Sequence, residues 1–305
     1  MKKTIHFIAS WAHYHRGLLS TGYLSVLSVG LSLSCQSESV STAQPSQPDS
    51  TNIPGLRLVW ADEFTKEGAP DPKKWRFEQG FVRNNELQWY QPDNARCQNG
   101  MLTIEARREQ RANPAYKAGS SDWKTNRPTI NYTSTSMNTN GLQTWQYGRF
   151  LMRARIDTRA GLWPAFWTLG TLGEWPANGE IDIMEFYKGK LLANVAFGSA
   201  KRWTANWRSS AKPLSSFTDP NWAQQFHIWR MDWDETSIKL YVDDLLLNEV
   251  KLSETLNGDG SGTNPFRQPH YLLLNMAVGG DNGGDPTSTS FPAKFDVDYV
   301  RVYQQ

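Results

Sequence analysis

Apolar and polar residues alternate with a period of two along most of the chain beyond about residue 55. Successive side chains of a β-strand point to opposite faces, so this alternation predicts strands with one buried face. The clearest examples are residues 102–107, 152–157 and 238–243. Turn-forming pairs lie between such segments: Asn99-Gly100, Asn140-Gly141, Asp234-Glu235 and Asp243-Asp244.

A nearly continuous apolar run at residues 272–278 predicts a further strand, buried on both faces. No stretch keeps the 3.6-residue period of an amphipathic helix, and no internal repeat or second domain is evident. We therefore expect one all-β domain, in which two curved antiparallel sheets pack face to face as a sandwich.

The first 34 residues predict a signal segment. A basic start is followed by an apolar, serine-rich run at residues 22–34, which is too short to span a membrane comfortably. Cys35 follows directly, and the arrangement resembles a bacterial lipoprotein signal in which this cysteine is lipidated. The alternative is a soluble secreted protein in which Cys35 has no such role.

Residues 35–54 are rich in Ser, Gln, Thr and Pro and contain few apolar side chains. A segment of this composition cannot bury enough apolar surface to fold, so we expect a disordered tether. The folded domain is then predicted to span residues 55–305.

The charge balance limits the class of ligand. The first 34 residues hold three basic groups and no acid, which leaves 29 basic against 30 acidic residues in the remainder. A nearly neutral body argues against nucleic acid as a partner, and mildly against a sulfated or uronic polymer.

Only Cys97 remains beside Cys35, so neither a disulfide framework nor a cysteine-based metal site is expected. The 14 tryptophans include candidate platforms for sugar rings, although most tryptophans lie in cores.

The most informative segment, Gly179 to Phe186, predicts a strand that carries three carboxylates. Glu180 and Asp182 share one face, whereas a regular strand would put Glu185 on the opposite, apolar face. An unpaired carboxylate buried there is costly. A β-bulge near Met184 would return Glu185 to the acidic face and send Phe186 to the core.

Three carboxyl groups on one surface cannot all stay ionised easily, so we expect their pKa values to separate. A retaining glycosidase needs one ionised and one protonated carboxyl group. The alternative is a set of surface acids on an exposed strand.

The neighbouring motifs identify a resemblance to glycoside hydrolase family 16, and within it to the bacterial laminarinase-like β-glucanases. They occur in the family's order and span about residues 56–303: 60–64 (WADEF), 84–88 (NNELQ), 147–150 (YGRF), 161–167 (GLWPAFW), 175–176 (WP), 180–185 (EIDIME), 274–280 (LNMAVGG) and 297–303 (VDYVRVY). The resemblance implies a concanavalin-like β-jelly roll, in agreement with the sandwich expected from the alternation.

The resemblance also implies roles for the acids. Glu180 would be the nucleophile, Glu185 the general acid and later the general base, and Asp182 would hydrogen-bond to Glu180 between them. No cofactor is implied for catalysis.

Several further residues are candidates for binding the sugar chain. By resemblance, Trp175 would stack on the sugar at the scissile bond. The other candidates are Trp163, Asn85, Trp203 and Asn275. For Trp163 a place in the core is an open alternative, for Asn85 a turn-stabilising role, and for Asn275 a purely structural one.

A structural calcium ion on the convex side of the sandwich is also implied, at Asp298 with help from the segments of Glu63 and Gly100. Calcium takes six to eight oxygen ligands, so one carboxylate does not define the site.

One strand departs from the family pattern. Where many relatives carry a histidine-glycine strand after the acids, this chain has residues 194–198 (NVAFG).

We expect a secreted, monomeric endo-glycosidase, lipid-anchored to the bacterial outer membrane or cell surface. Its expected substrate is a neutral β-glucan with β-1,3 or mixed β-1,3/1,4 linkages. The alternatives are another polysaccharide (as in an agarase, carrageenase or transglycosylase) and a non-catalytic carbohydrate-binding jelly roll.

Overall fold

The computed structural model describes residues 51–305, and its first strand begins at Arg57. The predicted signal segment, Cys35 and the tether up to residue 50 lie outside the described residues. None of the helices in the described part of the chain is long and apolar enough to cross a membrane.

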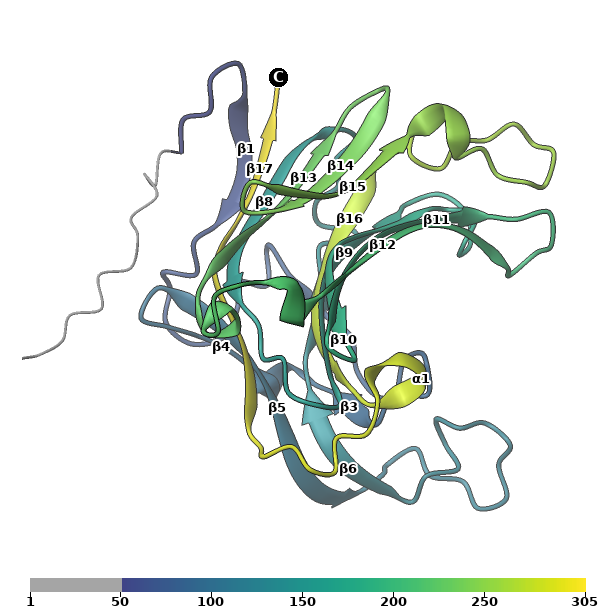
Figure 1. The fold of residues 1–305 in the computed structure, drawn as a ribbon. Coiled ribbons are helices and arrows are strands. Elements are labelled where there is room, and N and C mark those ends of the chain that lie inside the picture. Colours follow the sequence, from purple (N-terminus) through teal and green to yellow (C-terminus); the bar gives the residue numbers. More distant parts are fainter. Residues whose placement is uncertain (1–50) are drawn as a thin grey trace, which may run out of the picture. The chain divides into compact units, whose positions relative to one another are not determined.

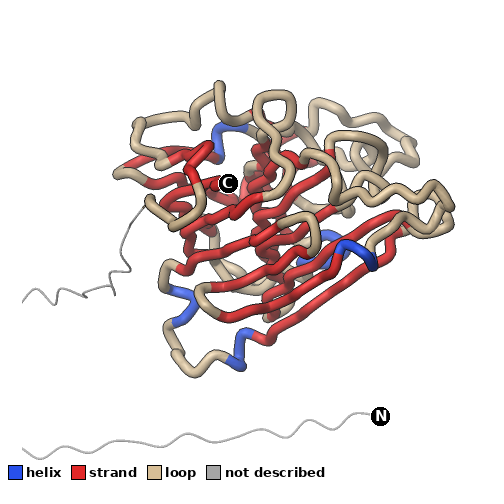
Figure 2. Tube along the Cα trace, turned by 90° about the horizontal axis from the view of Figure 1, so that it is seen from above, coloured by secondary structure: helices blue, strands red, loops and turns tan. Residues whose placement is uncertain are grey.

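Strands dominate the described chain, as Figure 2 shows in red, and they form two sheets (Figure 1). The larger sheet has ten strands, in the order β15-β14-β13-β8-β17-β5-β6-β3, with β1 paired to β17 and β4 to β5. Its strands are β1 (Arg57–Asp62), β3 (Gln88–Tyr90), β4 (Ala95–Gln98), β5 (Met101–Ala112), β6 (Thr129–Ser134), β8 (Gly148–Arg155), β13 (His227–Trp233), β14 (Ser237–Val242), β15 (Leu245–Lys251) and β17 (Ala293–Gln304). All pairs within it are antiparallel except β3 with β6.

The second sheet has seven strands in the order β12-β11-β10-β9-β16-β7-β2, and all of its pairs are antiparallel. Its strands are β2 (Arg76–Phe77), β7 (Ser136–Asn138), β9 (Leu162–Gly170), β10 (Glu180–Tyr187), β11 (Lys190–Gly198), β12 (Ala205–Pro213) and β16 (His270–Val278). The helices are short: α1 (Gly280–Gly283) and the 3-10 turns η1 (Pro92–Asn94), η2 (Leu214–Ser216), η3 (Trp222–Gln224) and η4 (Leu252–Glu254).

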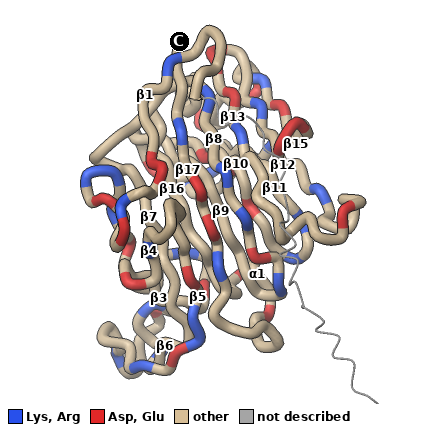
Figure 3. Tube along the Cα trace, turned by 90° about the vertical axis from the view of Figure 1, so that its left-hand side faces the viewer, with Lys and Arg blue, Asp and Glu red and all other residues tan. Residues whose placement is uncertain are grey.

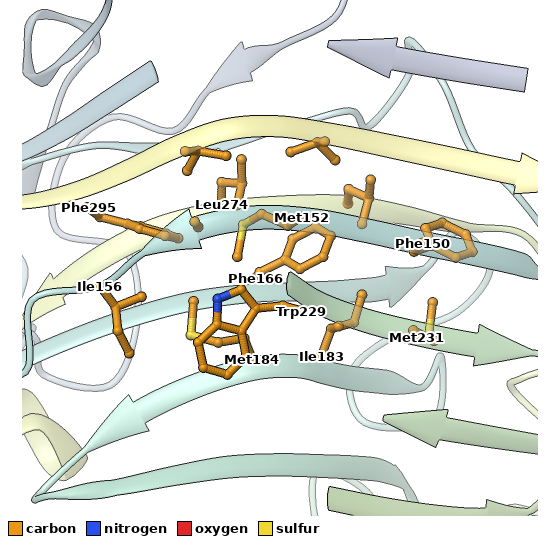
Figure 4. Packing of buried hydrophobic residues seen from close by; sticks show 14 of the residues in the cluster. Phe150, Met152, Ile156, Phe166, Ile183, Met184, Trp229, Met231, Leu274 and Phe295 are labelled. Atoms are coloured by element: carbon orange, nitrogen blue, oxygen red, sulfur yellow. The ribbon is translucent and has the colours of Figure 1, made fainter. Parts of the chain in front are cut away.

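The main hydrophobic core fills the space between the two sheets. Phe150, Met152 and Trp229 from the ten-stranded sheet pack against Phe166 and Met184 from the seven-stranded sheet (Figure 4). Fully burying each such side chain contributes about 1.5–3 kcal/mol. Burial of this continuous layer from both sheets holds the sandwich together.

The burial patterns confirm the strands predicted from alternation. Leu102, Ile104 and Ala106 are buried on β5, while the residues between them are half-exposed. Every residue from 272 to 278 is buried, as predicted for a strand covered on both faces. The all-β fold of two curved sheets is therefore confirmed.

The face of the seven-stranded sheet that points away from the core is here called the outer face. It carries a separate apolar cluster of Ala165, Trp167 and Leu273, with Leu169 and Tyr271 packed against it. Because β9, β10 and β16 are adjacent, this cluster lies beside the outward-facing side chains of β10.

Candidate active site

The acidic strand β10 begins directly after a glycine that no other residue could easily replace. Gly179 has φ +80°, in the left-handed region that favours glycine. A Cβ atom there would lie 2.9 Å from Cβ of Pro265 and 3.0 Å from Cε1 of Phe266. The close approach of this turn to residues 265–266 fixes where the strand starts, and therefore where Glu180 projects.

The predicted bulge in β10 is present. On β9, Asp182 pairs with Trp167 and Met184 with Phe166, so β10 contains one extra residue between these pairs. The pairing with β11 shifts in the same interval, between Asp182 and Glu185. Ile183, Met184 and Phe186 all belong to the core (Figure 4 labels the first two). The strand after the bulge therefore presents Glu185 on the same outer face as Glu180 and Asp182.

A pocket on the outer face contains all three acids. Its lining residues are Arg83, Asn84, Glu86, Trp163, Ala165, Trp167, Glu180, Asp182, Glu185 and Asn275. The structure thus brings Trp163 and Asn275 together with the acids. For Trp163, a place in the cleft agrees with the geometry better than a place in the core, and Asn275 lies at the cleft as well.

Glu185 is half-buried and receives two side-chain hydrogen bonds. Nε1 of Trp163 donates to its Oε1 at 2.7 Å, and Nδ2 of Asn194 donates to its Oε2 at 3.3 Å. Burial raises the pKa of Glu185 to about 8, and the nearby Glu180 charge adds to the rise. A carboxyl group with this pKa keeps its proton at neutral pH and can donate it.

Glu180 receives a different set of neighbours. Burial raises its pKa as well, but three groups favour its ionised form and oppose that rise. Nε1 of Trp175 donates to Oε2 of Glu180 at 2.5 Å, a side-chain hydrogen bond joins Glu180 to Asp182, and the guanidinium of Arg83 lies nearby. Glu180 is therefore the carboxyl group of the pair that is better stabilised as an anion.

Asp182 lies between the two glutamates and is only 4% exposed. Burial holds its pKa well above the ordinary range, and the charges of Glu180 and Glu185 raise it further. Its hydrogen bond to Glu180 then has a simple explanation, because a protonated Asp182 donates and an ionised Glu180 accepts.

A chain of hydrogen bonds supports the floor of the pocket. Nε1 of Trp167 donates to Oδ1 of Asn275 at 2.7 Å, and Nδ2 of Asn275 donates to the hydroxyl of Tyr90 at 3.1 Å. The guanidinium carbon of Arg83 lies 5.3 Å from the centre of the Trp167 ring. The sequence did not identify Arg83, Asn84 or Glu86 as site residues, although the 84–88 motif contains two of them. For Trp167 the sequence leaves a sugar platform and a place in the core as alternatives, and the structure puts it in the pocket lining.

The remaining sugar-binding candidates lie outside the pocket lining. Trp175 and Trp203 are 40% and 55% exposed. Trp203 lies in the turn between β11 and β12, and its neighbour Arg202 pairs with Glu174 at 2.7 Å, which ties this turn to the loop of Trp175. Asn85 is exposed, and its Nδ2 donates to Asp281 at 3.0 Å, so it joins the pocket-lining segment to α1.

The side chains predicted to lie at the calcium site, Glu63 and Asp298, pair with arginines in this structure. Arg301 donates to both carboxylate oxygens of Glu63 at 2.7 Å, and Arg153 donates to Asp298 at 2.5 Å. Gly100 forms the β4–β5 turn with φ +72°. Within residues 51–305 no group of three or more His, Cys, Asp or Glu side chains could hold a metal ion. This finding concerns side chains alone, whereas the predicted calcium site also uses backbone oxygens. Calcium binding stays a prediction, which melting with and without a chelator would test.

Comparisons with known proteins agree with this geometry. Residues 83–301 match the model of the glycosyl hydrolases family 16. A β-glucanase of Rhodothermus marinus is 37% identical over 270 residues, which cover 84% of this chain and 87% of that protein. The laminarinase catalytic domain of Thermotoga maritima is 33% identical, with a TM-score of 0.68 over 82% of this chain and 98% of that one.

A second similar structure comes from work on endo-acting O-glycanases that members of the human gut microbiota express to initiate mucin breakdown. It is 37% identical, with a TM-score of 0.75 over 83% of this chain and 92% of that one.

Proposed function

The chain belongs to glycosyl hydrolase family 16, and from this premise we propose that it is a retaining endo-glycosidase that cleaves internal bonds of a neutral β-glucan. Membership makes it a glycoside hydrolase whose substrate is a polysaccharide. The β-glucanase of Rhodothermus marinus and the laminarinase of Thermotoga maritima support a glucan with β-1,3 or mixed β-1,3/1,4 linkages.

The unequal surroundings of the two glutamates carry the proposal. Glu180 has a cation and two hydrogen-bonding neighbours that favour its anion, whereas Glu185 has a pKa of about 8. Glu185 therefore keeps its proton at neutral pH, and Glu180 has more neighbours that favour its ionised form. Retaining glycosidases use such a pair, one as nucleophile and the other as acid and then base.

In the first step the carboxylate of Glu180 attacks the anomeric carbon while the bond to the leaving oxygen breaks. Glu185 gives its proton to that oxygen. In the second step the ionised Glu185 takes a proton from water, which attacks the anomeric carbon and releases Glu180. Asp182, as a neutral donor, hydrogen-bonds to Glu180 whenever that group carries negative charge.

The exposed tryptophans offer platforms for the sugar chain. Trp175 contacts Glu180 directly, which supports a place for it beside the attacked sugar. Ala196 faces Glu180 across β10 and β11, and Trp207 faces Ala196 across β11 and β12. Directly paired residues share a face, so Trp207 lies on the outer face two strands from Glu180. Trp203 lies in the turn that joins β11 to β12, so it can extend the platform that Trp207 forms.

The test of the mechanism is the stereochemistry of the first product. Proton NMR during hydrolysis of laminarin should show the β-anomer before mutarotation. Glu180→Gln and Glu185→Gln should each lower kcat by at least about 1,000-fold while the native fold and sugar binding are kept. Glu249→Gln, which alters an exposed acid on β15 paired with Lys239, is the matched control and should keep full activity.

An initial α-anomer would contradict the role given to Glu180. Substantial turnover by either glutamine variant would contradict the assignment of the pair. If the protein only binds carbohydrate, the unaltered protein should release no reducing ends from any polysaccharide.

A second candidate function is cleavage of a different glycan by the same chemistry. The similar structure from the O-glycanase work and Asn194, at the strand that departs from the laminarinase pattern, favour this alternative. Release of reducing ends from laminarin, mixed-linkage β-glucan, agarose, carrageenan and mucin separates the two candidates.

A sulfated substrate has less support. Arg202 is paired with Glu174, and Nη2 of Arg208 donates to the backbone oxygen of Glu254 at 3.3 Å. Neither arginine lines the pocket. Figure 3 shows basic and acidic residues interspersed along the strands and loops, as expected for a protein whose substrate is neutral.

We also propose that the protein is a secreted monomer anchored by a lipid on Cys35 to the outer membrane or cell surface. Metabolic labelling with palmitate should mark the unaltered chain and leave Cys35→Ala unmarked. Light scattering of the purified domain gives the oligomeric state.

A further inference from the structure

The outer face differs in chemistry on the two sides of Glu180. A row of directly paired residues crosses the sheet through it: Tyr271 on β16, Leu169 on β9, Glu180 on β10, Ala196 on β11 and Trp207 on β12. Tyr271 and Trp207 each lie two strands away, about 10 Å from Glu180 at ~4.8 Å per strand. The Trp207 side is aromatic and exposed, whereas polar groups gather on the Tyr271 side.

Three side chains form this polar cluster: Glu78, Arg83 and Tyr271. The guanidinium of Arg83 lies over Trp167 and pairs with Glu78. Tyr271 packs against the apolar cluster that contains Trp167. Arg83 and Tyr271 thus lie beside the same tryptophan cluster, and Glu78 is joined to it through Arg83, although the three residues come from β16 and from the loop after β2.

Two observations show that the cluster faces the cleft. Phe77, the last residue of β2, packs against the main core, so its neighbour Glu78 points to the outer face. Arg83, which pairs with Glu78, lines the same pocket as Glu180, Asp182 and Glu185, and the Glu78 charge adds to the rise in the Tyr271 pKa that burial causes.

The cluster has capacity for additional hydrogen bonds. Among the described residues, none is hydrogen-bonded to the Tyr271 hydroxyl, which can both donate and accept. Oε2 of Glu78 accepts from Arg83 and from the Ser136 hydroxyl, while Oε1 has no protein donor in residues 51–305. A hydroxyl donor and a carboxylate acceptor on a sheet face are suited to the hydroxyl groups of a sugar.

Charge further limits the ligand. Among the pocket-lining residues that the structure describes, Arg83 is the single cation, against Glu86, Glu180, Asp182 and Glu185. Glu78 adds another carboxylate beside Arg83. Even with Asp182 and Glu185 protonated, the carboxylates of Glu78 and Glu180 outnumber the single guanidinium of Arg83, so a sulfate or uronate group placed here would meet net negative charge, which is unfavourable at short range.

We propose that Glu78, Arg83 and Tyr271 form a sugar subsite on the β16 side of Glu180, and that this subsite selects a neutral hexose unit over a sulfated or uronic one. The subsite is adjacent to the one that holds the sugar attacked by Glu180. This inference rests on the proposed glycosidase function, which it deepens by naming the substrate class on one side of the scissile bond.

The test compares Tyr271→Phe and Glu78→Gln with the unaltered enzyme. The substrates are laminarin oligosaccharides of three to six glucose units, and laminarin before and after chemical sulfation. Tyr271→Phe removes one hydroxyl without breaking a described protein hydrogen bond, so folding should be unaffected. We expect its KM for the longer oligosaccharides to rise about 3- to 10-fold, the effect of one lost hydrogen bond, with kcat within about 2-fold.

Glu78→Gln should reduce the preference for neutral over sulfated laminarin by at least about 3-fold, since the carboxylate that repels sulfate is gone. Tyr241→Phe, on β14 of the other sheet, is the matched control and should change neither quantity. A melting curve for each variant separates a loss of binding from a loss of folding.

The outcomes distinguish this inference from the proposed function. If the unaltered enzyme cleaves laminarin but Tyr271→Phe keeps its KM, or Glu78→Gln keeps its preference, the subsite is wrong and the glycosidase stands. If the unaltered enzyme cleaves none of the polysaccharides, both fail.

Discussion

Nε1 of Trp163 donates a 2.7 Å hydrogen bond to Oε1 of Glu185, the carboxyl group to which we assign the proton transfer. This bond stabilises the ionised form and lowers the pKa of Glu185. Trp163→Phe should therefore raise that pKa, move the alkaline limb of the kcat/KM profile to higher pH, and lower kcat about 10-fold.

Trp167→Phe is the matched control for Trp163, because the Trp167 indole donates to Asn275 and not to an acid. It should weaken substrate binding without moving the alkaline limb. Equal shifts of that limb in the two variants would show that the Trp163 bond has no special effect on Glu185.

The pH dependence of the unaltered enzyme follows from the two glutamates. Activity needs Glu180 ionised and Glu185 protonated. The alkaline limb should fall near pH 8, where Glu185 loses its proton, and the acid limb above pH 4.5, because the pKa of Glu180 is raised from that value. Initial rates on a soluble glucan between pH 4 and 10 give both limbs, as apparent values for the pair. A profile that stays flat to pH 9.5 would exclude Glu185 as the acid.

The raised pKa of Glu185 also makes folding depend on pH. The folded protein holds this proton up to about pH 8, whereas the unfolded chain releases it near pH 4.5. The folded state therefore binds more protons across this window, and stability falls as the pH rises through it. Glu185→Gln removes the buried charge, so we expect it to be more stable than the unaltered protein by about 1–3 kcal/mol at pH 8.

Urea denaturation at pH 4.5 and pH 8 measures this difference. The two proteins should be nearly equal at pH 4.5, where the carboxyl group is protonated in the folded state and about half protonated in the unfolded chain. A constant difference at both pH values would mean that the substitution acts through packing and not through the proton.

Asp182 is expected to act as a neutral hydrogen-bond donor to Glu180. Asp182→Asn keeps a donor of nearly the same shape, so its kcat should fall only about 10-fold. Asp182→Ala loses the donor, so its kcat should fall about 100-fold or more. Steady-state kinetics on laminarin give the comparison. If the asparagine and alanine variants lose the same activity, Asp182 does not act through this donated bond.

The acidic strand could be predicted from the sequence because its constraint is local. A carboxylate among Ile181, Ile183 and Phe186 violates the period of two, and one extra residue removes the conflict. The register of β10 with β9 confirms this reasoning. Alternation likewise predicted β5, β8 and β14, and the continuous apolar run predicted β16, because in each case the pattern lies within one short segment of the sequence.

The polar side of the cleft could not be predicted in the same way. Glu78 and Arg83 lie about 100 residues before Glu180 in the chain, and only the strand order β2-β7-β16-β9-β10 brings them to the same face. No local pattern marks Arg83 as a neighbour of Trp167. The arginine partners of Glu63 and Asp298 could not be predicted either, because strand pairing and tertiary packing bring Arg301 and Arg153 to these acids.

The position of β12 has a consequence for how this protein can change. It is the outermost strand of its sheet, it carries Trp207, and its hairpin tip carries Trp203, while the reactive acids lie two strands further in. Changes within residues 199–204 should therefore leave the bulge intact, provided that the Arg202–Glu174 pair beside Trp175 is kept. Grafting a different tip offers a route to new glycan preferences on an unchanged reaction centre.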